Sequence, residues 1–245
     1  MSKALILAGD GINCEIETAY AARDAGFSTQ TVHVNDFLKE QGASLAGTSL
    51  LVVPGGFSFG DELGSGKILA LKLKHGVGTA LTKYIDGGGA VLGICNGFQV
   101  LARLGVFGDG VVLTQNEQGH FLNRWVGLEI TGKSIFTDGL KKSGVTRLEL
   151  PMRHGEGRLI CPQSMHSELL GNGSVVLRYE EDVNGAWNRA AGLSSHHGRV
   201  MGLMPHPEAF WSEELHPWGM GRNVPLGVEM FRSAYNELTD SGGKS

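Results

Sequence analysis

Short, nearly uninterrupted apolar runs alternate with longer segments of helical periodicity over the first hundred residues. Apolar runs bounded by glycine or proline are typical of buried parallel strands, whereas apolar positions three and four residues apart indicate helices. Strands that alternate with helices imply a parallel sheet with right-handed crossovers. The predicted strands span 3–8, 28–34, 50–54 and 90–94, and the predicted helical segments span 14–25, 36–40, 67–86 (bent near Gly76 and Gly78) and 96–104.

The pattern changes after residue 104, where predicted strands follow one another with few helices between them. We therefore predict one α/β domain over residues 1–240: a mostly parallel central sheet flanked by helices, with an added β-rich portion in the second half. The Ser/Gly/Lys tail at 241–245 is expected to be disordered. The later elements are strands at 111–113, 125–131, 145–152 and 175–179, a helix at 163–170, a hairpin of 189–193 with 199–204, and a closing helix at 227–238.

Composition narrows the range of partners and locations. The 245 residues carry a net charge of −4 and no basic block, which argues against a nucleic-acid partner. Three cysteines without a C-x-x-C pair argue against a disulfide framework and fit a reducing cytosol. The N-terminal residues lack a long apolar core, and no apolar run approaches membrane-spanning length. We expect a soluble cytoplasmic protein with no membrane partner.

Cys95 lies at the junction between the strand at 90–94 and the helix at 96–104, within Gly93-Ile-Cys95-Asn-Gly97. This G-x-C-x-G pattern is the cysteine form of the nucleophile elbow, in which glycines relieve crowding around a tight turn. The helix N-terminus there favours thiolate over thiol. A buried structural cysteine is the alternative interpretation, and the motif alone does not decide between them.

His206-Pro207-Glu208 follows the last strand of the predicted hairpin. In an extended segment, residues i and i+2 point to the same side, and Pro207 biases His206 toward that conformation. Glu208 would then orient the imidazole, which could take a proton from a thiol and deliver it to a leaving amine. A surface turn is the alternative and, for this motif alone, the commoner case.

Gly55-Gly56 follows the strand at 50–54 and could supply part of an oxyanion hole. Such a hole needs backbone N–H groups that point at developing negative charge, and glycine permits the close approach. The N–H groups of Gly56 and Asn96, the residue after the candidate nucleophile, are the expected pair. An ordinary Gly-Gly turn is the alternative.

Three other motifs are weaker. The segment 60–67 is one residue too long for a phosphate-binding loop and carries Ile68 where that loop needs Ser or Thr. The pairs His196-His197 and His154/Glu156 lack further ligands at matched spacing, so no metal site is predicted. Cys14 and Cys161 have no nearby partner pattern and are interpreted as structural.

Five segments occur in order over nearly the whole chain: Gly11-Ile-Asn-Cys-Glu15, Val53-Pro-Gly-Gly-Phe-Ser-Phe-Gly-Asp61, Gly93-Ile-Cys-Asn-Gly-Phe-Gln99, His154-Gly-Glu-Gly-Arg158 and Met204-Pro-His-Pro-Glu208. In these segments the sequence resembles class I (triad) glutamine amidotransferases, which implies their flavodoxin-like fold. Within that class it is most similar to the family of glutaminase subunits of phosphoribosylformylglycinamidine synthase. The second and third segments are far more specific than G-x-C-x-G, because other amidotransferases commonly carry Leu in place of Asn96.

The resemblance implies roles for individual residues. Cys95 would be the nucleophile, with His206 and Glu208 completing the triad. Gly56 and Asn96 would form the oxyanion hole. The implied glutamine-binding residues are Gln99, Phe57 and Arg124.

The resemblance also implies a reaction and its partners. The chain would hydrolyse L-glutamine and pass ammonia to a synthetase subunit, which makes formylglycinamidine ribonucleotide from formylglycinamide ribonucleotide in purine biosynthesis. ATP and Mg²⁺ would belong to that synthetase, no cofactor to this chain, and a small third subunit is a further candidate partner. The sequence departs from the family at Gly64-Ser65, at Gln118 and over Trp211–Asn223. The two alternatives are a free-standing Cys-dependent γ-glutamyl hydrolase or peptidase and a non-catalytic regulatory subunit.

Overall fold

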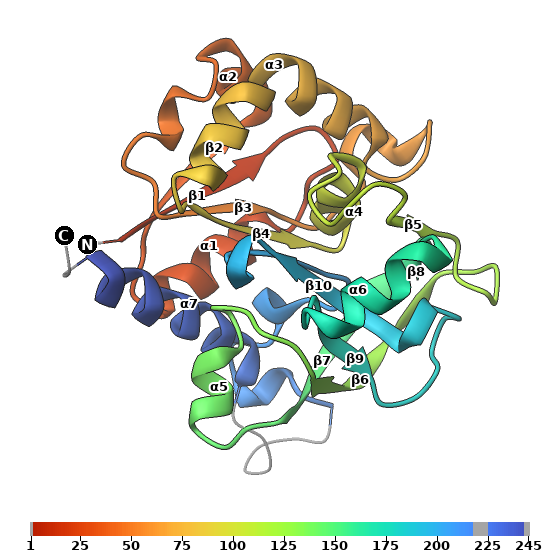
Figure 1. Cartoon of the computed structure of the whole chain (residues 1–245). Coiled ribbons are helices and arrows are strands. Elements are labelled where there is room, and N and C mark those ends of the chain that lie inside the picture. The colour runs from red at the N-terminus through yellow and green to blue at the C-terminus, as the bar shows by residue number, and fades with distance from the viewer. Residues whose placement is uncertain (1, 218–224, 243–245) are drawn as a thin grey trace.

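The structure is a computed structural model of the chain, in which residues 2–217 and 225–242 are described. The first part alternates strands and helices as predicted (Figure 1). Its elements are β1 (Lys3–Ala8), α1 (Glu15–Asp24), β2 (Ser28–His33), α2 (Val34–Lys39), β3 (Leu50–Val53), α3 (Lys67–Asp86), β4 (Ala90–Ile94) and α4 (Asn96–Arg103).

The second part is richer in strands. The predicted hairpin is confirmed, because the strands Ala190–Ser195 (β10) and Val200–Leu203 (β11) pair antiparallel around a turn at His196–Gly198. The elements of this second part are β5 (Val112–Thr114), β6 (Leu122–Ile130), α5 (Asp138–Lys142), β7 (Arg147–His154), β8 (Arg158–Ile160), α6 (His166–Gly171), β9 (Val175–Tyr179), β10 (Ala190–Ser195), β11 (Val200–Leu203) and α7 (Leu226–Gly242). Helix α5 and the short strand β8, which pairs with β5, were not predicted.

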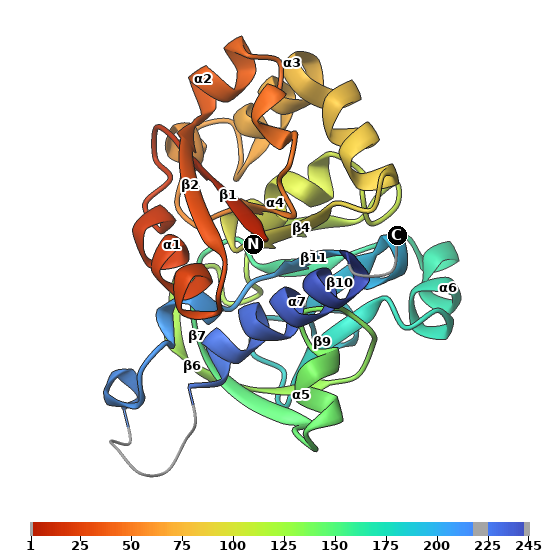
Figure 2. The same cartoon turned by 90° about the vertical axis from the view of Figure 1, so that its left-hand side faces the viewer.

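One sheet of nine strands, in the order β2-β1-β3-β4-β11-β10-β9-β6-β7, runs through the molecule. The strands from β2 to β11 in this order are parallel, and the pairs beyond β11 are antiparallel. The β-rich portion is therefore a continuation of the central sheet and not a separate layer. Helices α2, α3 and α4 lie on one side of the parallel half, and α1 and α7 on the other (Figures 1 and 2).

The two covered faces explain the apolar runs in the sequence. Every residue of β3 and β4 is buried, because both strands lie in the middle of the parallel half with helices on either face. Strand β2, at the edge, has only exposed or half-buried residues. The parallel arrangement places the carboxyl ends of β1, β3, β4 and β11 at one edge of the sheet, which is where sites form in open α/β sheets.

Helix α3 runs without a break through Gly76 and Gly78, where a bend was predicted. Gly76 has a packing role: a Cβ there would lie 2.6 Å from Leu38 Cδ2 of α2. The glycine lets two helices approach closely, a role that sequence alone does not distinguish from a bend.

The described part of the chain ends in α7, which extends through Gly242, so residues 241 and 242 of the predicted disordered tail are helical instead. Residues 243–245 of the predicted disordered tail lie outside the described residues, as do residues 218–224 of the unfamiliar stretch after Glu208. Within the described part of the chain, no helix combines the length and the apolar character needed to cross a membrane.

Candidate active site

Cys95 stands in a strained turn between β4 and α4. Its φ of 50° and ψ of −105° are unusual for a residue with a side chain, and the backbone holds it there through a hydrogen bond from Cys95 N to Leu203 O at 2.8 Å. A Cβ at Gly93 would lie 2.6 Å from Leu101 Cδ1, and one at Gly97 would overlap Val53 O. Both glycines of G-x-C-x-G are therefore needed for α4 to pack against the sheet, as expected of a nucleophile elbow.

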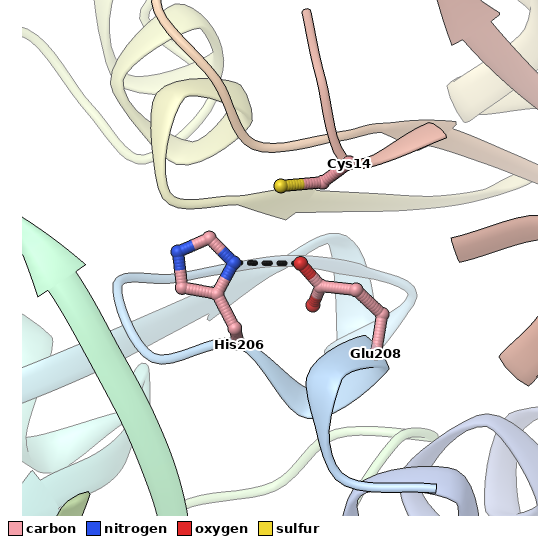
Figure 3. Close-up of side chains that lie close together, drawn as sticks. All are labelled: Cys14, His206 and Glu208. Carbon is pink, nitrogen blue, oxygen red and sulfur yellow. Dashed lines mark hydrogen bonds and ion pairs between the residues drawn. The ribbon is translucent and has the colours of Figure 1, made fainter. Parts of the chain in front are cut away.

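His206 and Glu208 form a buried pair at the same edge of the sheet. Leu203, the last residue of β11, pairs with Ile94, so the chain after β11 emerges beside Cys95. His206 Nδ1 lies 2.6 Å from Glu208 Oε1, and the two residues are 3% and 1% exposed (Figure 3). The surface-turn alternative is therefore wrong.

The local backbone differs from the extended segment that the His-x-Glu spacing predicted. His206 is extended, but residues Pro207–Ala209 form a 3-10 turn with proline at its start. Proline is well suited to the first position of a helical turn because it has no N–H to leave unpaired. The imidazole and the carboxylate thus meet across a turn, and not along a strand.

Electrostatics favour a charged His206. Burial of the ring opposes the charged form, but the carboxylate of Glu208 and the sulfur atoms of Cys95 and Cys14 outweigh it, so the pKa of His206 is raised well above its ordinary value of 6.5. The thiol of Cys95 also lies 3.6 Å from the carbonyl oxygen of Arg153. The site can therefore support an imidazolium next to a sulfur nucleophile, which is what the predicted triad requires.

Gly56 occupies a crossing between two loops. Phe57 N donates to Gly11 O at 2.7 Å and Asn13 N donates to Gly55 O at 3.3 Å, so the bridge between Ile12 and Gly56 uses groups on either side of Gly56. The N–H of Gly56 itself is not used by the hydrogen bonds of this bridge. With a φ of 145° and no room for a Cβ beside Gly11 O, the position requires glycine.

The second predicted oxyanion donor, the N–H of Asn96, belongs to the first turn of α4, where amides lack helical partners. The geometry is compatible with the predicted pair, whose role stays a prediction.

The side chain of Asn96 holds the loop after β3 in place. Its Nδ2 donates to Gln99 Oε1 at 2.9 Å and to Asp61 Oδ1 at 3.2 Å, and its Oδ1 accepts from Ser58 N at 3.2 Å. Gln99 Nε2 in turn donates to the carbonyl oxygen of Glu156. Both amide ends of Gln99 are thus engaged within the protein, and its predicted contact with glutamine stays a prediction.

The departure at Gly64-Ser65 affects the same loop. Ser65 N donates to Glu156 Oε2 at 3.3 Å, and Ser65 O accepts from Arg103 Nε at 2.8 Å. Both bonds use the main chain, so they do not depend on which side chain stands at this position. Burial of Asp61 raises the pKa of its carboxyl group despite its hydrogen bonds.

Gln118, another departure, also has a bond within the chain. Its Nε2 donates to Val183 O at 3.0 Å.

His154 was not predicted as a site residue. Burial, and then the charge of His206, lower its pKa to about 3, so it is neutral at physiological pH. Its Nδ1 faces Asn116 Oδ1 at 3.0 Å, whereas Glu156 bonds to Ser65, so the two groups have separate partners.

Phe57 and Arg124, the other predicted glutamine-binding residues, lie toward solvent. Phe57 is 49% exposed, and its ring centroid is 6.3 Å from that of Phe121. Arg124 is exposed on β6 and lines a cavity of about 220 Å³ that also includes Trp125 and Glu149. Burial raises the pKa of the nearby Tyr179, an effect that the charge of Arg124 opposes. Their contacts with glutamine stay predictions.

One large cavity lies away from these residues. About 820 Å³ in volume, it is lined by the turn between β10 and β11, including His196 and His197, and by none of the predicted catalytic residues. That turn adjoins the amino end of β11, so the cavity and the predicted site lie at opposite ends of this strand.

Part of the stretch after Glu208 packs beside the cavity that Arg124, Trp125 and Glu149 line. The ring of His216 lies 4.5 Å from that of Trp125 and 5.6 Å from that of Phe210, and its Nε2 is 2.9 Å from Glu149 Oε2. These contacts anchor the beginning of a segment that the sequence did not explain.

Cys14 belongs to the site and was not predicted there. It precedes α1 after β1, at the edge shared with Cys95 and His206, and one ligand atom from each of Cys14, His206 and Glu208 lies within 4.8 Å of the others (Figure 3). The sequence feature that could have indicated a site role for Cys14 was its position in Gly11-Ile-Asn-Cys14, in the loop that follows the parallel strand β1.

The fold and the site together define a glutamine amidotransferase. Residues 1–236 match the family described as the CobB/CobQ-like glutamine amidotransferase domain, and the chain belongs to this family. A solved structure from Thermoplasma acidophilum, described as part of a GMP synthase, shares the fold, with a TM-score of 0.62 and 17% identity over 99% of this chain and 96% of that chain.

The curated relatives point to one member of this class. The chain is 38% identical to phosphoribosylformylglycinamidine synthase subunit PurQ of Methanococcus maripaludis over 227 residues, which cover 84% of this chain and 81% of the relative. The PurQ subunit of Dehalococcoides mccartyi is 37% identical over 235 residues, 88% of each chain. The solved structure of PurLQS from Thermotoga maritima matches with a TM-score of 0.78 and 32% identity, over 97% of this chain and 99% of that chain.

Proposed function

We propose that this chain is the glutaminase subunit of a phosphoribosylformylglycinamidine synthase. It hydrolyses L-glutamine to glutamate and ammonia. A separate synthetase subunit uses that ammonia and ATP to convert formylglycinamide ribonucleotide to formylglycinamidine ribonucleotide. The observation that carries the proposal is the buried pair of His206 and Glu208, 2.6 Å apart, at the sheet edge where β4 presents Cys95.

The first half of the reaction uses Cys95 and His206. The Cys95 thiolate attacks the side-chain carbonyl carbon of glutamine, and the N–H groups of Gly56 and Asn96 stabilise the oxyanion. His206, charged through its neighbours, gives its proton to the departing nitrogen, so ammonia leaves and a γ-glutamyl thioester remains.

In the second half, neutral His206 removes a proton from water, which attacks the thioester. Glutamate leaves, the Cys95 thiolate reforms and His206 is charged again. Glu208 stabilises the imidazolium in both halves.

The names of the relatives favour a synthase subunit over a free-standing γ-glutamyl hydrolase. PurQ relatives aligned over more than four fifths of both chains are called subunits of one synthase, and the Thermotoga structure is described as PurLQS. By analogy, the partners of this chain are a synthetase and a small third subunit, and ATP with Mg²⁺ belongs to the synthetase. A cytoplasmic location follows from the need to keep the Cys95 thiol reduced.

The decisive experiment measures glutamate release from glutamine by this chain alone and by the complete mixture of chain, cognate synthetase subunits, ATP and formylglycinamide ribonucleotide. We expect strong stimulation in the complete mixture. Equal turnover in both conditions, with cleavage of γ-glutamyl peptides, would identify a free-standing hydrolase instead.

Replacement of Cys95 separates glutamine hydrolysis from the synthetase reaction. Cys95→Ala should abolish glutamine-dependent synthesis and leave synthesis from added ammonia, with Cys161→Ala, a half-buried thiol elsewhere in the chain, as the matched control. A folded Cys95→Ala complex that loses both activities would refute the division of labour, and one that keeps both would refute Cys95 as the nucleophile.

A further inference from the structure

Cys14 and the His206–Glu208 pair form a compact cluster of three side chains that also occur as ligands of zinc. One ligand atom from each residue lies within 4.8 Å of the other two. In Figure 3 the sulfur of Cys14 points over the side of the imidazole that carries Nδ1, the nitrogen that faces Glu208. The proposed reaction uses His206 and Glu208 but gives Cys14 no part.

The distances suit a tetrahedral cation after small adjustments. Zn²⁺ binds sulfur at about 2.3 Å and imidazole nitrogen or carboxylate oxygen at about 2.0–2.2 Å, so tetrahedral ligand atoms lie about 3.4–3.6 Å apart. The 2.6 Å contact between His206 and Glu208 would lengthen, and the sulfur would move inward by up to about 1.3 Å. Rotations of the side chains provide movements of this size.

Two observations show that the cluster has room and free ligand atoms. Glu208 Oε2 is buried and, among the described residues, has no hydrogen-bond partner, so it has lone pairs to offer a cation. A Cβ at Gly55 would lie 2.8 Å from His206 Cε1 and 3.4 Å from Cys14 Sγ. Glycine at this position therefore keeps the space between sulfur and imidazole clear.

We propose that Cys14, His206 and Glu208 form an inhibitory binding site for a thiophilic divalent cation of the zinc class. Cys14 supplies a thiolate, His206 supplies Nδ1 and Glu208 supplies a carboxylate oxygen. The fourth position is left for water. A cation at this site competes with the His206–Glu208 hydrogen bond and leaves the sulfur of Cys95 untouched.

The inhibition follows from the proton balance. When the cation binds, the Cys14 thiol and Nδ1 of the charged His206 each release a proton to solvent, and His206 is held as the neutral imidazole with hydrogen on Nε2. The lone pair of Nδ1 is then occupied by the metal, and Nε2 already carries its proton. His206 can neither accept a proton from the Cys95 thiol nor donate one as an imidazolium, so glutamine hydrolysis stops. This consequence rests on the proposed glutaminase function, whereas cation binding does not.

Binding is tested first without any activity measurement. Co²⁺ added to the Cys95→Ala chain should produce a thiolate-to-cobalt charge-transfer absorption, which Zn²⁺ should displace. The band should vanish in Cys95→Ala/Cys14→Ser and persist in the matched control Cys95→Ala/Cys161→Ser. Cys14→Ala in the same background is a second test of the ligand. A band that survives both Cys14 substitutions, or no band in folded Cys95→Ala, would overturn the proposal.

Inhibition is tested on the assembled complex. We expect Zn²⁺ to inhibit glutamate release, a chelator to restore it, and the concentration for half-inhibition to rise roughly 10-fold or more in Cys14→Ser relative to the Cys161→Ser complex. Equal sensitivity of the two complexes would overturn the inhibitory role. A complex that releases no glutamate under any condition would refute the glutaminase function, and the cobalt band would still decide the site.

Discussion

Asn116 and His154 determine each other's hydrogen bonding. Asn116 Nδ2 donates to the carbonyl oxygens of His154 at 2.8 Å and of His120 at 3.1 Å, so its Oδ1 is the atom that faces His154 Nδ1. That oxygen can only accept, so Nδ1 carries the hydrogen and the neutral ring presents a bare Nε2. Among the described residues, this buried Nε2 has no hydrogen-bond partner. Burial, and then the charge of His206, lower the pKa of the ring.

The first prediction concerns acid stability. A histidine whose pKa falls to about 3 on folding binds fewer protons in the native state than in the unfolded state between pH 3 and 6.5, so it destabilises the fold as pH falls through this range. We expect His154→Gln to reduce the loss of unfolding free energy between pH 7 and pH 5 by about 2 kcal/mol, measured by urea denaturation. The exposed His75→Gln is the control, and equal pH dependence in wild type and His154→Gln would contradict the assignment.

His154 and Cys14 show why part of the site could not be predicted from sequence. Each lies in a segment that carries the resemblance, but no local pattern assigns it a role, and each acquires its contacts from a distant loop: Asn116 for His154, and the His206 turn for Cys14. Local periodicity places strands and helices because it depends on nearby residues. It does not tell which loops meet at the edge of the sheet, nor which rotamers their side chains adopt.

The second prediction concerns the loop crossing at Gly56. An added Cβ would overlap Gly11 O, and the φ of 145° is unfavourable for alanine, so Gly56→Ala must move the loop that carries the predicted oxyanion donor. We expect glutamate release by the complex to fall about 10²–10³-fold, as for the loss of one oxyanion-hole donor. Ammonia-dependent synthesis should be retained.

Gly47→Ala is the matched control for Gly56. It also has a positive φ, 70°, but nothing lies within 4 Å of the added Cβ. It should therefore cost stability alone, about 1 kcal/mol, with near-normal glutamate release. Equal activity losses in the two variants would show that backbone strain, and not the position of the Gly56 amide, explains the effect.

The third prediction concerns Glu208. Glu208→Gln keeps the size of the side chain but removes the charge that stabilises protonated His206, so the pKa of His206 should fall. We expect kcat for glutamate release to drop about 10²–10⁴-fold and the ionisation of His206 in the pH profile to move to lower pH. Glu17→Gln removes an exposed carboxylate on the neighbouring α1 and should change neither. An unchanged pH profile in Glu208→Gln would show that Glu208 does not act through His206.

The fold was more predictable than the site, for reasons visible in particular strands. The strands β3 and β4 are buried on both faces, so their sequences are continuously apolar and their existence was evident. Strand β8 is three residues long and begins with a charged residue, so it lacks the apolar run at 111–113 from which its partner β5 was predicted. The turn at Pro207–Ala209 was predicted as extended because the i, i+2 rule says nothing about a proline that begins a 3-10 helix.

The last prediction concerns Asn96, where other amidotransferases commonly carry leucine. Asn96 is 1% exposed, and its amide joins α4 to the loop at residues 58–66 through Ser58 and Asp61. Asn96→Leu would remove these bonds and leave the N–H of Ser58 without its acceptor in a buried setting, whereas the half-buried carboxylate of Asp61 keeps the bond from Gly66 N. An unsatisfied buried polar group costs about 1–3 kcal/mol, so we expect the free energy of unfolding to fall by about 2 kcal/mol.

Asn96→Leu should destabilise the loop at residues 57–66 by more than it lowers the stability of the whole fold. Amide hydrogen exchange over residues 57–66 should accelerate by more than the change in global stability accounts for, because these amides lose their link to α4. Since this loop continues from Gly56, glutamate release by the complex should also fall while the ammonia-dependent reaction persists. Asn35→Leu, an exposed position on α2, is the control and should change stability by less than about 0.5 kcal/mol. Unchanged exchange over residues 57–66 in Asn96→Leu would mean that the loop is held by its main-chain bonds alone, such as those of Ser65 to Glu156 and Arg103.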